Sequence, residues 1–259
     1  MKRFFSQAWL SFKTRYAVIS FEEFIFLETL YPLVTLSFYC ILAAYSFNTS
    51  NLAKWVVGNS FLLCTNTCIF ILGRAFEGER YSGRIRSLII SPVNKLLIVL
   101  EKGIFPAIVS IITVFFGFMI GSLLFGVDFT SINLGIFLVV IIVGMFSITG
   151  FSLFLSSFGL ITDSMHFILN LVANILIIFS GANFPISQLP QALQIISRII
   201  PLTRSIEAAN MLFSTYDTSK FVWLLFTEAI LGIIFYITSY FVIQIAEKIA
   251  KKNATLELF

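Results

Sequence analysis

Residues 132–160 read INLGIFLVVIIVGMFSITGFSLFLSSFGL, and this segment is the clearest indication of the fold that the chain adopts. It is longer than the roughly 20 residues that an α-helix needs to cross the hydrocarbon core of a bilayer. It contains no charged side chain, and it lacks the regular apolar–polar alternation of a membrane β-barrel strand. The segment therefore predicts a membrane-spanning helix.

The composition of the whole chain agrees with this interpretation. Of the 259 residues, 58% are hydrophobic and only 12% are charged, and the mean hydropathy is +0.97. A soluble fold of this length needs more charge to cover its surface. We therefore expect a single all-α integral membrane domain over residues 1–259 with six transmembrane helices. The predicted spans are residues 24–47, 55–73, 104–125, 132–160, 165–182 and 221–245.

The first 23 residues have the pattern of a helix that lies in the membrane interface. Phe5, Trp9, Phe12 and Tyr16 follow one another at spacings of three and four residues, so a helix places them on one face. Basic residues stand at the ends and on the opposite side. We expect an amphipathic interfacial helix within residues 1–23.

The distribution of basic residues predicts the orientation. Most of the 17 Lys and Arg residues lie in the N-terminal segment, in residues 74–102 and in the C-terminal tail. Because cytoplasmic loops are enriched in Lys and Arg, we expect a multi-pass protein of the plasma membrane with both termini in the cytoplasm. The basic residues form no continuous face, which argues against nucleic acid as a partner.

The cytoplasmic region 74–102 contains the sequence FEGERYSGRIRSLIISP at residues 76–92. Helical spacing puts Ile85 and Leu88 on one face and Arg80 and Arg84 on another. This pattern favours a short amphipathic helix that offers charge to a cytoplasmic partner. The alternative is a solvated connector that is rich in charge.

The second long loop, residues 183–219, is too apolar for an ordinary solvent-exposed loop. Leu189, Leu193 and Ile196 are in helical register, and prolines interrupt the segment at both ends. Two short helices that re-enter the outer leaflet would satisfy these side chains. A helical hairpin that lies on the membrane surface fits the pattern equally well.

Polar residues inside the predicted spans are candidates for a substrate pathway, because ionisable and amide groups are costly in lipid. Polar residues of this kind also hold helices together through hydrogen bonds. Gly117 and Gly121 form a Gly-x-x-x-Gly pattern that we assign to packing within the chain. The candidate pathway residues are Glu28, Asn59, Asn66, Asn170, Asn174 and Glu228.

The sequence contains no motif for catalysis, for metal binding or for binding a nucleotide. It has one histidine, no Gly-x-x-x-x-Gly-Lys-Ser/Thr loop, no Gly-x-Ser-x-Gly and no His-Glu-x-x-His. We expect neither an enzyme nor a cofactor bound by this chain. Any energy for transport must then come from another polypeptide.

Two motifs resemble those of the ABC-2 type export permeases. A Glu79-Arg80-x-x-Gly83 stretch that runs to Ser91-Pro92 is similar to the coupling region of that family. The Gly-x-x-Phe-Pro-x-x-x-Leu-Pro run of residues 181–190, followed by Pro201, is similar to its outer signature. The plan of an interfacial helix and six spans resembles the family across the whole chain.

The resemblance implies the function and the partners. The chain would be the permease of an exporter from the branch that moves drugs, lipids or peptides outward. It would dimerise with a second copy or a paralogue, and ATP and Mg would bind to a separate cytoplasmic ATP-binding subunit. That subunit would dock on the helix at residues 79–92.

The resemblance also implies roles for individual residues. Basic Arg84 and Arg86 depart from the family pattern, because an acidic residue is expected after the Gly83 turn. The residues assigned to ATPase coupling are Glu79, Arg80, Gly83, Arg84, Arg86, Leu88, Ser91 and Pro92. The residues assigned to an extracellular gate are Phe184, Pro185, Leu189, Pro190 and Pro201.

Two other classes of membrane protein remain as alternatives. An ion-coupled secondary transporter usually has a site near the midplane within a repeated arrangement of broken helices. The chain shows no internal repeat and no central carboxylate, which argues against this class. A structural or immunity-type membrane protein without transport activity is the other alternative.

Overall fold

The computed structural model describes residues 2–16, 22, 26, 30–49, 51–83, 95–128, 132–162, 164–213 and 217–253. Within these ranges the regular secondary structure is helical and no strand occurs. The helices are α1 (Lys2–Tyr16), α3 (Tyr31–Phe47), α4 (Ala53–Leu62), the π-helix η2 (Asn66–Leu72), α5 (Ala75–Tyr81), α7 (Lys95–Phe125), α8 (Leu134–Phe158), α9 (Met165–Phe179), the 3-10 helix η3 (Ile186–Gln188), α10 (Gln191–Ile199), α11 (Thr203–Met211) and α12 (Thr218–Asn253).

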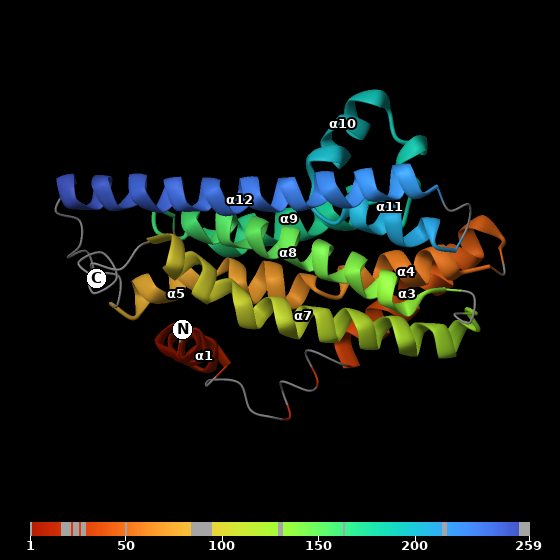
Figure 1. Ribbon diagram of the computed structural model, residues 1–259, viewed down its shortest axis with the longest axis horizontal. Helices are drawn as coiled ribbons and strands as arrows, with labels where there is room; N and C mark the ends of the chain where they lie inside the picture. The colour runs from red at the N-terminus through yellow and green to blue at the C-terminus, as the bar shows by residue number, and fades with distance from the viewer. Residues whose placement is uncertain are drawn as a thin grey trace.

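Most of the long helices run roughly parallel or antiparallel in one bundle, and α1 lies across it (Figure 1). The helix α12 runs beside α8, and α7 packs against α8, α4 and α1. The helix α5, α1 and the C-terminal part of α12 lie toward one end of the bundle. We call this end the α5 end.

The six predicted spans each overlap an apolar helical segment. Four segments are long and apolar enough to cross a membrane, and two shorter apolar helices accompany them. A total of six spans remains a prediction, because the shorter two do not reach the length of the others. The long segments are Ala53–Tyr81, Leu96–Phe125, Leu134–Phe158 and Thr218–Ile245, and the shorter ones are Tyr31–Phe47 and Met165–Phe179.

Two helical segments extend beyond the spans that the sequence predicts. The second span was expected to end at residue 73, but the helical segment continues through α5 to Tyr81. The third was expected to begin at residue 104, but α7 begins at Lys95. In both places charged side chains lower the hydropathy of the sequence, and in the folded chain Glu79 of the first place pairs with Lys102 of the second at 2.7 Å.

The helices α8 and α12 pack closely against each other. A Cβ atom at Gly150 would lie 2.8 Å from the Tyr236 ring and 2.9 Å from the Gly232 carbonyl oxygen. The hydroxyl groups of Thr149 and Tyr236 are 2.9 Å apart in the same contact. We call the region where α8, α11 and α12 pack together the closed seam.

The predicted intramolecular role of Gly117 and Gly121 is confirmed. A Cβ atom at Gly121 would lie 3.0 Å from Val56 and 3.2 Å from Leu36, and one at Gly117 would meet Leu63. The missing side chains let α7 approach α3 and the second span closely.

The helix α1 contacts the rest of the chain mainly through aromatic residues. Trp9 and Phe12 pack on Phe105 of α7, with ring centroids 5.2 and 5.6 Å apart. Phe5 and Leu10 remain exposed. A helix that crosses the bundle near one end and exposes apolar side chains has the arrangement that an interfacial helix requires.

Candidate functional site

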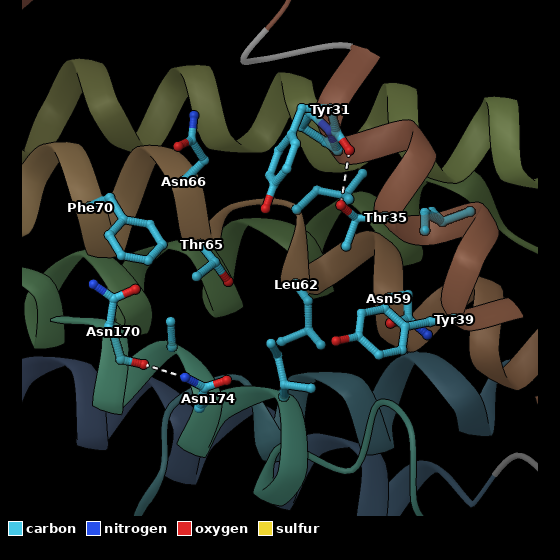
Figure 2. Close-up of a pocket in the computed structure, with 15 residues that line it drawn as sticks. Tyr31, Thr35, Tyr39, Asn59, Leu62, Thr65, Asn66, Phe70, Asn170 and Asn174 are labelled. Carbon is cyan, nitrogen blue, oxygen red and sulfur yellow. Dashed lines mark hydrogen bonds between the residues drawn. The ribbon is translucent and has the colours of Figure 1, made fainter. Parts of the chain in front are cut away.

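A cavity of about 470 Å³ lies between α3, the α4–η2 segment and α9. Figure 2 shows that Tyr31, Thr35 and Tyr39 approach it from α3, whereas Asn170 and Asn174 approach it from α9. We call the region formed by α3, η2 and α9 the open face. The fifteen lining residues are Tyr31, Pro32, Thr35, Leu36, Tyr39, Asn59, Leu62, Leu63, Thr65, Asn66, Phe70, Asn170, Ala173, Asn174 and Ile177.

The structure brings four of the six predicted pathway residues together. Asn59, Asn66, Asn170 and Asn174 all line this one cavity, although they come from three helices. Glu28 lies outside the described residues. Glu228 belongs to the closed seam and does not line the cavity.

Local helix geometry directs these side chains into the cavity. Tyr31, Thr35 and Tyr39 follow at intervals of four residues and so share one face of α3. The π-helical turns of η2 widen the second span at the cavity, and Asn66 and Phe70 of these turns are lining residues. Such turns are frequent at functional sites. These three α3 residues were not among the predicted pathway residues, although their regular spacing is visible in the sequence.

The asparagine side chains donate hydrogen bonds mainly to the chain itself. Asn170 Nδ2 donates to the His166 carbonyl oxygen at 2.7 Å, and Asn174 Nδ2 donates to the Asn170 carbonyl oxygen at 2.9 Å. Asn59 Nδ2 donates to the Trp55 carbonyl oxygen at 2.9 Å and to Asn183 Oδ1 at 3.1 Å. The Asn59 contact ties the second span to the loop that follows α9.

A second set of polar contacts lies at the α5 end. Lys102 Nζ of α7 is 2.7 Å from Glu79 Oε1 of α5, and the side chains of both residues are largely buried. The Lys102 ammonium also lies 5.3 Å from the centre of the Phe76 ring. The Phe76 backbone N–H donates to Ser156 Oγ of α8 at 3.0 Å. These contacts join α5 to both α7 and α8.

This pairing bears on the predicted coupling residues. Glu79 was expected to face an ATPase, but its carboxylate is turned toward Lys102 of the same chain. The Arg80 guanidinium lies 5.5 Å from the centre of the Tyr81 ring, and Gly83 has a φ of 68°. The sequence pattern offered no signal for Lys102. The other predicted coupling residues, Arg84, Arg86, Leu88, Ser91 and Pro92, lie outside the described residues.

The predicted gate residues lie where the short helices of the second loop begin. Pro185 precedes η3 and Pro190 precedes α10, and Pro201 stands two residues before α11. Proline suits these positions because a first helical turn needs no backbone donor there. Phe184 is 47% exposed, and Leu189 ends η3 as its C-cap residue.

The two short α-helices of this loop differ in burial. The helix α11 packs against α4, α8 and α12, and most of its residues are buried. The helix α10 projects from the side of the bundle (Figure 1) and exposes Ile195, Ile196 and Ile199. Only α11 is therefore enclosed by the chain, so a pair of re-entrant helices remains a prediction.

Glu228 of α12 holds the beginning of α11. Its carboxylate is fully buried and accepts a hydrogen bond from the Leu202 backbone N–H at 2.7 Å. The Arg204 guanidinium lies 3.7 Å from the second carboxylate oxygen. The Ser147 hydroxyl of α8 faces the same carboxylate without a hydrogen bond of standard geometry. Leu202 has a φ of 74°, which the capping contact stabilises.

Among the described residues, no cluster of three or more His, Cys, Asp and Glu side chains could hold a metal ion. Comparison with curated proteins found no match. The sequence profile of the family described as ABC-2 type transporter matches residues 5–214. Members of this family are membrane permeases that work with a cytoplasmic ATP-binding subunit. A match over most of the length, combined with a bundle of apolar helices, shows that this multi-pass membrane chain belongs to the ABC-2 type transporter family of ABC transporter permeases.

Proposed function

We propose that the chain moves an amphiphilic or hydrophobic substrate, such as a drug, lipid or peptide, outward across the plasma membrane. The observation that supports this most directly is the cavity of about 470 Å³ on the open face. Its volume falls in the range of sites that bind drug-sized molecules. Seven apolar residues and eight residues with a polar side-chain group line it, as an amphiphile requires.

The power for this movement comes from a separate cytoplasmic ATP-binding subunit that docks at the α5 end. The Glu79–Lys102 contact at 2.7 Å and the Phe76–Ser156 hydrogen bond join α5 rigidly to α7 and α8. Force applied to α5 would therefore move the ends of two spans together. Both chain termini lie on the cytoplasmic side in this arrangement.

The opposite half of the bundle would release the substrate. Asn59 lines the cavity and donates to Asn183, next to the predicted gate residue Phe184. A movement of the second span at the cavity would therefore reach the loop that carries α10 and α11. A second permease chain, either another copy or a paralogue, completes the transporter.

The docking end can be tested by crosslinking the complex in its native membrane. Tyr81 and Ile195 are similarly exposed, at 58% and 64%, but lie in different regions. The natural cysteines Cys40, Cys64 and Cys68 are buried. A Tyr81→Cys chain should crosslink to an ATP-binding subunit, and an Ile195→Cys chain should not. Crosslinking of that subunit only to the Ile195→Cys chain would reverse the proposed orientation.

Transport through the cavity can be tested by filling it. Asn174 is an exposed lining residue of α9, and Phe167 is an exposed residue of the same helix outside the cavity. In inverted vesicles that contain the complete complex, Asn174→Trp should abolish ATP-dependent uptake of a dansyl-labelled alkylamine. Phe167→Trp should leave that uptake unchanged. Equal uptake by the two variants would refute the proposed route.

A further inference from the structure

The amide nitrogens of the cavity asparagines already donate hydrogen bonds within the chain, which decides which of their atoms remain for a ligand. Asn170 Nδ2 donates to the His166 carbonyl oxygen at 2.7 Å and contacts His166 Nδ1 at 3.1 Å. Asn59 Nδ2 likewise makes two hydrogen bonds, at 2.9 and 3.1 Å. Each amide nitrogen has only two protons, so both of these nitrogens are fully used.

The orientation of these amides is fixed by their partners. A backbone carbonyl only accepts hydrogen bonds, so the group that faces it must be the amide nitrogen. The same argument applies to Asn174, whose Nδ2 donates to the Asn170 carbonyl oxygen at 2.9 Å. No hydrogen bond to Oδ1 of Asn59, Asn170 or Asn174 occurs within the part of the chain that the structure describes. These three amides therefore offer acceptors to the cavity.

The Thr35 hydroxyl adds to this bias. The Thr35 hydroxyl donates to the Tyr31 carbonyl oxygen at 2.9 Å, so its remaining capacity is to accept. Tyr31, Tyr39 and Phe70 add aromatic rings. The Tyr31, Tyr39 and Thr65 hydroxyl groups can donate or accept and so do not discriminate. None of the fifteen described lining residues carries a charge.

From this arrangement we infer that the cavity selects substrates whose polar head is a hydrogen-bond donor, above all a protonated amine on an apolar body. An ammonium group has three donors for the amide oxygens and is attracted to aromatic faces. A carboxylate only accepts, so it would lose water and meet other acceptors. The inference rests on the proposed function of the cavity and names the class of its substrate.

Matched probes test this selectivity. Four dansyl compounds with the same alkyl chain would end in an ammonium, hydroxyl, methyl or carboxylate group. Binding is measured at neutral pH to the full chain, with the subunits that co-purify with it, in phosphatidylcholine nanodiscs. Empty nanodiscs give the background. We expect the ammonium probe to bind about 10-fold more tightly than the carboxylate probe, with the hydroxyl probe between them.

Variants connect the selectivity to the amide oxygens. Asn170→Leu should weaken binding of the ammonium probe about 3-fold to 10-fold and leave the methyl probe unchanged. Unchanged binding of the methyl probe also shows that the variant is folded. Tyr45→Phe is a control, because Tyr45 lies on α3, is 88% exposed and does not line the cavity.

The outcomes separate this inference from the proposed function. If the carboxylate probe binds as tightly as the ammonium probe and Asn174→Trp blocks both, the selectivity is wrong but the cavity remains the binding site. If Asn174→Trp and Asn170→Leu change the binding of no probe, the cavity is not the site, and both proposals fail.

Discussion

Polar side chains differ in burial and in charge type between the closed seam and the open face. In the closed seam, the carboxylate of Glu228 is fully buried and holds Leu202 and Arg204 at the beginning of α11. On the open face, the described cavity lining is uncharged, and Asn170 and Asn174 are partly or largely exposed.

The difference shows how one helical bundle separates structure from binding. A buried carboxyl group is tolerated where a backbone N–H donates to it and a guanidinium lies nearby, and such a group holds helices in one arrangement. Amide groups can be left partly exposed without that penalty and remain available to a ligand. The contacts of Glu228 lie away from the cavity.

The largest expected effect on stability concerns Glu228 of the closed seam. Glu228→Leu leaves the Arg204 guanidinium and the Leu202 N–H without their buried partner. We expect the free energy of unfolding to fall by about 3 to 5 kcal/mol, measured by thermal or denaturant unfolding in a lipid environment. The control is Glu207→Gln, since the Glu207–Lys220 pair is partly exposed and should contribute at most about 1 kcal/mol. Equal stability of the two variants would show that Glu228 is no anchor.

A second change tests how tightly the closed seam is packed. Gly150→Ala would place a methyl group 2.8 Å from the Tyr236 ring and 2.9 Å from a backbone oxygen of α12. Overpacking of this kind should lower the stability by about 1 to 3 kcal/mol. At Gly78 of α5 an added Cβ meets nothing within 4 Å. Gly78→Ala should therefore leave the melting temperature unchanged or raise it; a lower value for Gly78→Ala than for Gly150→Ala would contradict this account.

A third comparison concerns two asparagines that line the same cavity, one buried and one exposed. Asn59 is 2% exposed and donates to Asn183, so Asn59→Leu leaves a buried acceptor unpaired and should destabilise the chain by about 1 to 3 kcal/mol. Asn174 is exposed, and Asn174→Leu should change stability by less than about 0.5 kcal/mol. If Asn174→Leu lowered the free energy of unfolding more than Asn59→Leu does, Asn174 rather than Asn59 would be the residue that stabilises the fold.

The smallest expected effect concerns α10. Ile195 is 64% exposed on a helix that projects from the bundle. Ile195→Ser should therefore alter the stability of the isolated chain by about 0.5 kcal/mol or less. A loss of several kcal/mol, seen as a large drop in melting temperature, would mean that α10 packs into the fold and that both short helices belong to the closed seam.

Hydropathy alone predicted much of the architecture. The all-helical class follows from the apolar runs, and the match over residues 5–214 confirms the ABC-2 type resemblance. The helix α7 begins at Lys95, before the predicted span, in a segment where Glu101 and Lys102 lower the hydropathy. Lys102 is buried in this helix beside Glu79, which is 23 residues away in the chain and comes within 2.7 Å of it.

The candidate site was predicted in part. Asn59, Asn66, Asn170 and Asn174 were identified one by one as polar residues in apolar helices, and they share a cavity. Their common location could not be read from the sequence, because it depends on how three helices pack. The same limit explains Glu228, whose role as an anchor depends on the neighbouring α11 rather than on its own helix.

What the sequence determined by itself is local. A backbone in lipid must satisfy its hydrogen bonds within its own segment, so a long apolar run forms a helix wherever it packs. The tertiary structure decided which polar groups became anchors and which remained available to a ligand. That choice depends on partners far apart in the chain, such as Glu228 with Arg204 and Asn59 with Asn183, and only the packed bundle brings them within hydrogen-bonding or ion-pairing distance.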